Sequence, residues 1–226
     1  PRVAILSTGD ELVQPGQPLQ PAALYDTNGA IVTAAISENG GEAHFLGAIA
    51  DDEALLEAAM RKALETSDML VLSGGTSKGA GDVSHRIIGR LGKPGIIAHG
   101  VALKPGKPLC LAVCDGKPVV ILPGFPTSAV FTFHEFVAPV LRRLAGTPPL
   151  ERETARATLA LRTHTERGRL EYLLVGLVRG EDGALRAYPM GKGSGSVTTP
   201  RSSWCPATAS AIAGEGRLSR RSSTSG

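Results

Sequence analysis

Short apolar runs alternate with amphipathic stretches throughout the first 145 residues, and this alternation limits the folds open to the chain. Residues 3–6 and 68–73 have the length and apolar content of buried strands. Residues 27–39 and 53–65 carry their apolar side chains at helical spacing. Strands that alternate with helices form parallel sheets with right-handed crossovers. The sequence therefore predicts an α/β fold, a doubly wound and mostly parallel sheet with helices on both faces.

A hairpin and a long helix complete this pattern. Residues 109–113 and 119–122 are apolar runs, and the Cys-Asp-Gly-Lys sequence between them has the composition of a tight turn. Residues 127–144 predict one continuous helix, which Pro126 opens.

The Thr-Pro-Pro sequence at 147–149 marks the clearest domain boundary. Residues 1–146 form the predicted α/β domain. Beyond the prolines the apolar period changes to two, which predicts a small, incomplete β domain over residues 150–199.

Residues 200–226 differ from both. They hold seven serines, and their four arginines and one glutamate account for the whole formal net charge of +3. With no helical or strand period, this segment is predicted to be disordered. It is either a natural tail or the product of a shifted reading frame. Because the rest of the chain is neutral, no basic face for nucleic acid is expected.

Composition excludes further classes of protein. No run reaches the eighteen or so consecutive apolar residues of a membrane span, and the first residues turn polar too early for a signal peptide. Cys110, Cys114 and Cys205 are too few for a disulfide framework, so we expect a reducing, cytoplasmic setting. The five histidines show no metal-ligand spacing.

Polar, glycine-rich segments follow the predicted strands, at the edge where doubly wound folds bind ligands. Glycines let backbone N–H groups approach a phosphate, and a helix start adds further N–H groups. The alternative is that these segments are only turns. The candidate ligand-binding residues are Thr8, Gly9, Asp10, Gly74, Gly75, Thr76, Ser77, Gly79, Pro123, Gly124, Thr127 and Ser128.

Charged side chains accompany these segments. Lys104 and Lys107 lie three residues apart on a proline-braced loop, where both ammonium groups can face one oxyanion. Carboxylates suit a hard cation such as Mg²⁺. The predicted metal ligands are Asp10, Glu11, Asp52 and Asp82. Solvated loops remain the alternative for the lysines and for Asp10, as does a helix N-cap for Asp52.

Four motifs, STGDEL, SGGTSKGAGD, LKPGKP and LPGFPTS, occur in this order between Arg2 and Thr199. In combination they resemble the molybdenum-insertion enzymes of molybdenum cofactor biosynthesis, the MoeA type, which includes the E domain of gephyrin. Members of that family use Mg²⁺ to insert molybdate into adenylated molybdopterin, and they release AMP.

The resemblance implies roles for particular residues. The glycine loop and the 123–128 turn are expected to hold the pterin phosphate. The small β domain is expected to supply oxyanion contacts from Arg169 and Ser194, with Ser196 as an alternative to Ser194. The implied catalytic residues are Glu11, Asp52, Asp82 and Lys104, and the implied molybdate contacts are Lys104, Lys107, Pro108, Arg169 and Ser194.

The chain departs from the family pattern in two places. Family members usually carry about as much chain again before STGDEL, so the resemblance covers a C-terminal half, and the expected final strands are replaced by the Ser/Arg segment. Two alternatives to molybdenum insertion therefore stay open. One is a molybdopterin adenylyltransferase, and the other is a non-catalytic module that binds molybdopterin or docks a partner. Small-molecule substrates, a possible homodimer and molybdenum enzymes as recipients are the expected partners.

Overall fold

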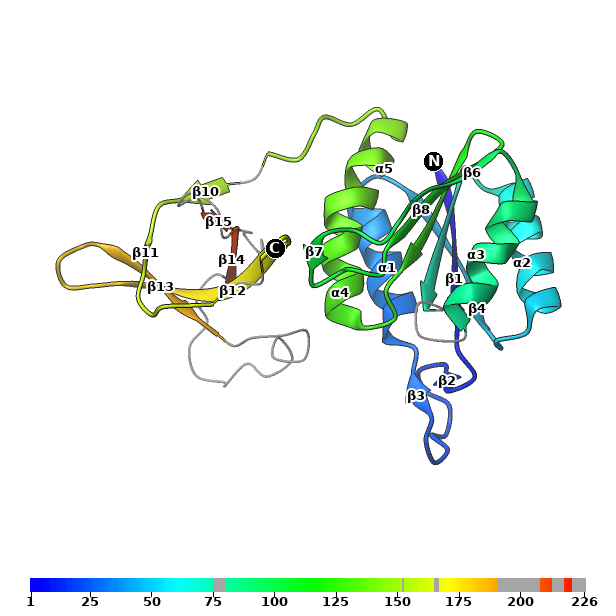
Figure 1. Cartoon of the computed structure of the whole chain (residues 1–226), viewed down its shortest axis with the longest axis horizontal. Coiled ribbons are helices and arrows are strands. Elements are labelled where there is room, and N and C mark those ends of the chain that lie inside the picture. Colours follow the sequence, from blue (N-terminus) through cyan, green and yellow to red (C-terminus); the bar gives the residue numbers. More distant parts are fainter. Residues whose placement is uncertain (75–79, 152, 165–166, 191–207, 213–217, 221–226) are drawn as a thin grey trace. The chain divides into compact units, whose positions relative to one another are not determined.

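The structure is a computed structural model that describes residues 1–74, 80–151, 153–164, 167–190, 208–212 and 218–220 (Figure 1). The chain divides into two units. Unit 1 contains residues 1–101 and 106–149, and unit 2 contains residues 102–105 and 150–226.

Unit 1 is built on a six-stranded sheet. Its strands lie in the order β4 (Glu42–Ile49), β1 (Arg2–Thr8), β5 (Met69–Gly74), β9 (Lys117–Leu122), β8 (Cys110–Cys114) and β6 (Pro94–His99). The first four strands are parallel, and β8 and β6 continue the sheet in antiparallel pairing. The predicted α/β class with a mostly parallel sheet is confirmed.

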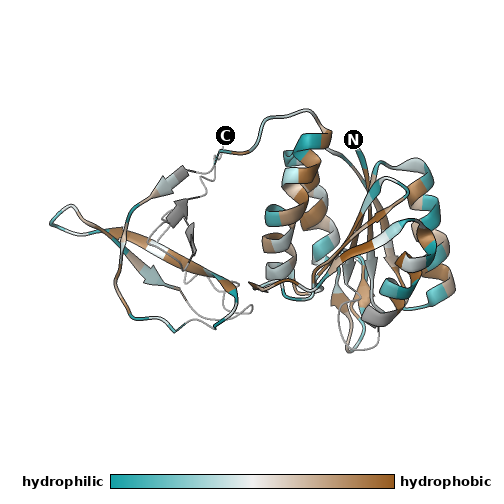
Figure 2. Ribbon diagram, turned by 45° about the horizontal axis from the view of Figure 1, so that its top comes forward, coloured by the Kyte–Doolittle hydropathy of each residue, from teal (hydrophilic) through white to brown (hydrophobic). Residues whose placement is uncertain are grey.

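Helices cover both faces of this sheet (Figure 1). Val3 and Ile5 of β1 pack in one apolar core, and Ala4 and Leu6 pack in the other. Strands buried on both sides have no polar face, which explains the unbroken apolar runs in the sequence. In Figure 2 brown residues run along the strands of the sheet, whereas the helices carry both brown and teal residues. The helices are α1 (Thr27–Glu38), α2 (Glu53–Thr66), α3 (Ala80–Leu91), α4 (Pro126–Thr132) and α5 (Ala138–Leu144).

The predicted hairpin is confirmed as β8–β9. Asp115 and Gly116 at its turn have φ angles of 49° and 83°, the positive values that a two-residue turn of type I′ requires.

The predicted single helix over 127–144 is interrupted. A π-helical turn, η1 (Phe133–Val137), separates α4 from α5, and the Ala138 N–H donates to the Phe133 carbonyl. Pro139 has no N–H with which to continue the α-helical ladder, so the turn before it widens. The sequence pattern alone gave the correct extent but not this interruption.

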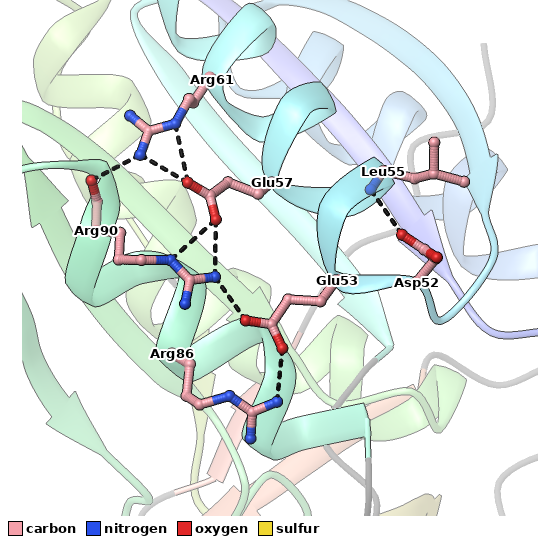
Figure 3. A network of polar contacts seen from close by, with 7 residues as sticks. All are labelled: Asp52, Glu53, Leu55, Glu57, Arg61, Arg86 and Arg90. Carbon is pink, nitrogen blue, oxygen red and sulfur yellow. Dashed lines mark hydrogen bonds and ion pairs between the residues drawn. The ribbon is translucent and has the colours of Figure 1, made fainter.

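Ion pairs join the exposed faces of α2 and α3 (Figure 3). Glu53 contacts Arg86 and Arg90 at 2.7 Å each, and Glu57 contacts Arg61 and Arg90 at the same distance. Hydrogen bonds from these arginines lower the pKa of both glutamates below the ordinary value of 4.5. The network therefore ties the two helices together most strongly when both carboxylates are ionised.

Stability should depend on pH through this network. A carboxylate whose pKa is lowered by folding contributes stability above its unfolded value, and the contribution disappears as the pH falls through the folded pKa. Lowering the pH below about 4.5 should therefore reduce the melting temperature of the wild type more than that of the Glu53→Gln/Glu57→Gln double variant. Because the pairs are exposed, high salt should reduce the difference. An equal pH dependence in both proteins would contradict the prediction.

Unit 2 contains a small β sheet around the long strand β12 (Leu170–Arg179). β12 pairs with β13 (Leu185–Pro189) and β14 (Thr208–Ile212) in antiparallel fashion, and with β7 (Leu103–Lys104) in parallel. Leu173, Val175 and Ala187 form its core. The remaining strands are β10 (Glu153–Ala155), β11 (Thr158–Leu159) and β15 (Leu218–Arg220). A small β region after the α/β unit is thus confirmed, whereas the boundaries at 146, 150 and 199 stay predictions.

Part of the segment predicted to be disordered forms strands. β14 and β15 lie within residues 200–226, and the rest of that segment lies outside the described residues. The five paired residues of β14 lie opposite Tyr172–Gly176 of β12. Strand pairing uses backbone groups, so a short Thr-Ala-Ser-Ala-Ile sequence can join a sheet without the apolar period on which the prediction relied.

Ending the chain after Thr199 should therefore affect unit 2. The shortened protein should show faster amide exchange along β12, because β14 supplies hydrogen-bond partners there. Unit 1 should keep its melting temperature, since neither β14 nor β15 pairs with its strands. Unchanged exchange along β12 would contradict the pairing.

No helix in the described part of the chain is long and apolar enough to cross a membrane.

The two described cysteines lie in the core of unit 1. Cys110 and Cys114 are buried free thiols, and burial raises the pKa of Cys110 to about 11. Both therefore stay protonated and unreactive near neutral pH. Cys205 lies outside the described residues.

Candidate ligand pocket

A cavity of about 200 Å³ lies at the carboxyl ends of β1 and β5 in unit 1. This is the edge where parallel α/β sheets bind ligands. Its described lining is Thr8, Gly9, Glu11, Leu12, Leu24, Tyr25, Asp26, Thr27, Asn28, Asp51, Ser73, Gly74, Gly124 and Pro126.

An arm of the chain between β1 and α1 forms one wall of the cavity (Figure 1). Its two short strands, β2 (Leu12–Val13) and β3 (Leu24–Tyr25), pair in parallel. The Leu24 N–H donates to the Glu11 carbonyl at 2.7 Å, and the Tyr25 hydroxyl donates to the Gln17 carbonyl at 3.0 Å. These bonds fix Leu12, Leu24 and the Tyr25 ring as an apolar wall.

The start of α1 forms the polar base. Asp26 is the N-cap, and its Oδ1 accepts from the Gly29 N–H at 2.9 Å. Asn28 donates through Nδ2 to Ser73 Oγ at 2.9 Å and to the Gly124 carbonyl at 2.8 Å. Asn28 therefore holds together the ends of β5 and β9, which are far apart in the sequence.

Three carboxylates are among the lining residues of the cavity. Thr8 Oγ1 donates to Asp51 Oδ1 at 2.6 Å, and the Asp51 N–H donates to Asp10 Oδ1 at 3.0 Å. With Glu11 and Asp26, Asp51 gives the cavity three acidic side chains, and no Lys, Arg or His is among its described lining residues. The described pocket is thus acidic.

Gly74 brings two strand ends into close contact. Its φ is +98°, and a Cβ there would lie 2.3 Å from the Thr8 carbonyl oxygen. Only glycine fits both the conformation and the space.

The structure brings part of the predicted set together. Thr8, Gly9, Glu11, Gly74 and Gly124 line the cavity. Asp10 contacts the backbone of Asp51. Pro123, Thr127 and Ser128 lie in the segment from β9 into α4 without lining the cavity, and Thr127 and Ser128 are buried. Gly75, Thr76, Ser77, Gly79, Ser194 and the side chain of Asp82 lie outside the described residues.

Asp52 lies at the N-cap of α2, the alternative that the sequence left open for it. Its Oδ1 accepts from the Leu55 N–H at 2.9 Å and caps α2 (Figure 3). The neighbouring Asp51 lines the cavity instead. Within the described residues no three His, Cys, Asp or Glu side chains are grouped closely enough to hold a metal ion. The side chain of Asp82 lies outside them, so the predicted set of four ligands stays a prediction.

Asp26, Asn28 and Asp51 line the cavity but are not among the residues predicted from the sequence. Asp51 and Asp52 both lie in the link between β4 and α2. The rule that polar residues follow strand ends therefore applied equally to both and could not choose between them. Asp26 and Asn28 precede or open a predicted helix, where they resemble ordinary caps. Only the fold shows that they line the cavity.

Lys104 lies in unit 2, on β7. Its Nζ is 3.3 Å from Oε1 of Glu171, its register partner on β12, and Glu171 is buried. The alternative of a solvated loop lysine does not hold for Lys104, because strand pairing places the ammonium beside a buried carboxylate. Arg169 immediately precedes β12 in the same unit. Lys107 is exposed and Pro108 half-buried, both in unit 1.

Comparisons with known proteins match both units. The family described as “Probable molybdopterin binding domain” matches residues 4–143, and the family described as “MoeA C-terminal region (domain IV)” matches residues 156–207. A molybdopterin molybdenumtransferase of Nostoc is 41% identical over 149 residues, 65% of this chain and 34% of that protein.

Two further relatives extend the match. Molybdopterin molybdenumtransferase 2 of Mycobacterium tuberculosis is 34% identical over 76% of this chain and 43% of that protein. The crystal structure of a molybdopterin biosynthesis MoeA protein from Pyrococcus horikoshii superposes with a TM-score of 0.76 at 35% identity, over 97% of this chain and 54% of that one. The chain thus spans about half or less of the length of these relatives. Because the first match covers more than half of its residues, the chain belongs to the molybdopterin-binding domain family.

Proposed function

We propose that this chain contributes to the insertion of molybdate into adenylated molybdopterin, with Mg²⁺ as cofactor and AMP as the released product. The observation that carries the proposal is the acidic cavity at the strand ends of a molybdopterin-binding domain, whose lining includes the carboxylates of Glu11 and Asp51 and the apolar side chains of Leu12, Leu24 and Tyr25.

The charge of the cavity supports a role for Mg²⁺. A phosphorylated ligand placed beside Glu11, Asp26 and Asp51 is repelled unless a cation compensates. Mg²⁺ is usually held by one or two carboxylates together with substrate phosphates, so a complete protein cage is unnecessary. We propose Glu11 and Asp51 as its protein ligands and leave Asp52 to its capping role.

When bound there, Mg²⁺ would neutralise phosphate oxygens and polarise the phosphate linkage to AMP. The side chains of the chain prepare this arrangement. Thr8 Oγ1 donates to Asp51 Oδ1 and keeps that carboxylate oriented, while Asp10 accepts from the Asp51 backbone and fixes the loop. Gly74 allows the ends of β1 and β5 to approach closely at the floor of the cavity.

Two of the proposed oxyanion contacts, Lys104 and Arg169, lie on unit 2. Lys104 and Arg169 are placed by neighbouring strands, since Leu170 pairs with Leu103 and the Leu170 N–H donates to the Ala102 carbonyl at 2.8 Å. Ammonium and guanidinium groups suit a dianion such as molybdate. Lys107, Pro108 and Ser194 remain proposed contacts on the basis of family resemblance.

The test is AMP release from the purified chain supplied with adenylated molybdopterin, Mg²⁺ and molybdate, with a control that lacks molybdate. Molybdate-dependent AMP, lost in Asp51→Asn, supports the proposal. ATP-dependent adenylylation of molybdopterin would identify an adenylyltransferase instead. Ligand binding without turnover would indicate a non-catalytic binding module. The match of residues 156–207 to the MoeA C-terminal region favours insertion over adenylylation.

We further propose a cytoplasmic location, supported by the buried, unpaired Cys110 and Cys114. The product would pass to molybdenum enzymes. A homodimer remains a prediction, to be tested by the mass of the protein in solution.

A further inference from the structure

A buried carboxylate interrupts the apolar face of β12 in unit 2. Side chains alternate between the two faces of a strand, so Glu171 lies on the same face as Leu173 and Val175, which belong to the core of this unit. Glu171 itself is buried. Desolvation makes a carboxylate costly at such a position, and the attraction within a buried ion pair often fails to offset that cost. The presence of Glu171 therefore points to a role other than packing.

Strand pairing determines what this carboxylate contacts. Lys104 is the last residue of β7 and the register partner of Glu171. Its Nζ lies 3.3 Å from Glu171 Oε1, and the two side chains are 30% and 7% exposed respectively. The lysine is therefore accessible to a dissolved ion, whereas the carboxylate is covered. An anion that reaches Lys104 meets an ammonium group that already has a carboxylate beside it.

The net charge of this pair matters for anion binding. The ammonium attracts an oxyanion and the neighbouring carboxylate repels it, so the pair attracts an anion less strongly than an unpaired lysine would. Coulomb energy is proportional to the charge of the ligand. The carboxylate therefore costs a dianion twice as much binding free energy as it costs a monoanion of the same shape.

We propose that Glu171 sets the oxyanion affinity of Lys104, because it competes with the anion for the ammonium group and weakens dianions more than monoanions. In this sense Glu171 is a specificity-determining residue that acts without touching the anion. This deepens the proposed function and rests on it for the role of Lys104 as an oxyanion contact. Tight binding before the reaction gives no increase in rate to an anion that must leave its contacts during insertion. A weakened contact therefore suits the transfer of molybdate.

Molybdate and perrhenate provide the test, since both are tetrahedral oxyanions, the first with two negative charges and the second with one. Glu171→Gln keeps the length of the side chain and an acceptor for Lys104, and it removes the charge. In titration calorimetry this variant should bind molybdate at least about tenfold more tightly than the wild type does. Because free energy scales with charge, the gain for perrhenate should be the square root of the gain for molybdate, roughly threefold for a tenfold gain.

Asp182→Asn is the matched control. Asp182 pairs with Arg186 at 2.6 Å, and it lies in the turn between β12 and β13 of the same unit. Roughly 25 Å of extended strand separates it from Glu171, more than the screening length near physiological salt. The control removes the same charge from unit 2 and should leave both affinities unchanged. Lys104→Ala should weaken molybdate binding and so identify the site that is measured.

A folding defect in Glu171→Gln would not prevent the comparison. Glu171→Met has a similar length and suits the apolar face of β12, so it removes the charge without placing an amide in the core. Thermal melting of each variant shows which of them is folded.

Three results would overturn the inference. The first is unchanged molybdate affinity in a folded variant of Glu171, and the second is an equal gain or an equal loss for both anions, which would assign the carboxylate a purely structural role. If Lys104→Ala still weakens molybdate binding, either result leaves the oxyanion role of Lys104 intact. The third is the absence of molybdate binding by all these proteins at millimolar concentration, which would overturn that role as well.

Discussion

Gly74→Ala is expected to lower the free energy of unfolding by roughly 3 kcal/mol or more and to abolish ligand binding in the pocket. The alanine Cβ would lie 2.3 Å from the Thr8 carbonyl oxygen, and φ at this position is +98°. Because the obstructing atom belongs to the backbone of β1, relief requires the ends of β1 and β5 to separate. The same movement would displace the floor of the cavity.

The matched control is Gly116→Ala. Gly116 has a φ of +83°, close to that of Gly74, but a Cβ there meets nothing within 4 Å. It should cost only about 1 kcal/mol of backbone strain and leave the pocket unaffected. Urea unfolding of both variants gives the comparison. Similar losses in the two proteins would show that the left-handed conformation, and not the approach of the strands, determines the effect.

Lys104→Ala should reduce molybdate-dependent AMP release about a hundredfold, the usual scale for removing one charge-stabilising group from a reaction site. It should also destabilise unit 2, because Glu171 is only 6% exposed and would lose its ion pair with Lys104. We expect roughly 1–3 kcal/mol, less than for a fully buried pair, since the Lys104 side chain is 30% exposed.

A double variant separates the two effects. Lys104→Ala/Glu171→Gln also removes the charge of the buried carboxylate and should recover most of the lost stability, as measured by thermal melting. AMP release should remain low, because the ammonium is still absent. Recovery of both stability and activity would assign Lys104 a purely structural role.

The parts of the fold that local patterns determine were predictable. β1 and β5 are buried on both faces, so the apolar runs alone located them, and the Asp115-Gly116 turn located the β8–β9 hairpin. The π-helical turn before Pro139 and the strand β14 were missed. The π-helical turn depends on a single missing backbone N–H, that of Pro139, within an otherwise regular helical pattern. The strand β14 depends on backbone pairing with β12, and the local sequence of β14 does not reveal that pairing.

The pocket was predictable only in part, for the same reason. Thr8, Glu11 and Gly74 follow strand ends, a rule that sequence can apply. Asn28 could not be found in this way, since its bonds reach residues 45 and 96 positions along the chain. Asp51 and Asp52 are chemically identical neighbours. Only the start of α2 decides which of them caps the helix and which lines the cavity.

The path of residues 102–105 has a practical consequence for dividing the protein. These residues belong to unit 2, although unit 1 flanks them on both sides. A cut after Pro149 would therefore leave Lys104 on one fragment and Glu171 on the other, and it would remove β7 from the sheet that contains β12. The β unit is not a cassette that can be exchanged between relatives at a single junction. A functional exchange must carry the LKPGKP loop together with the residues that follow the Pro-Pro boundary.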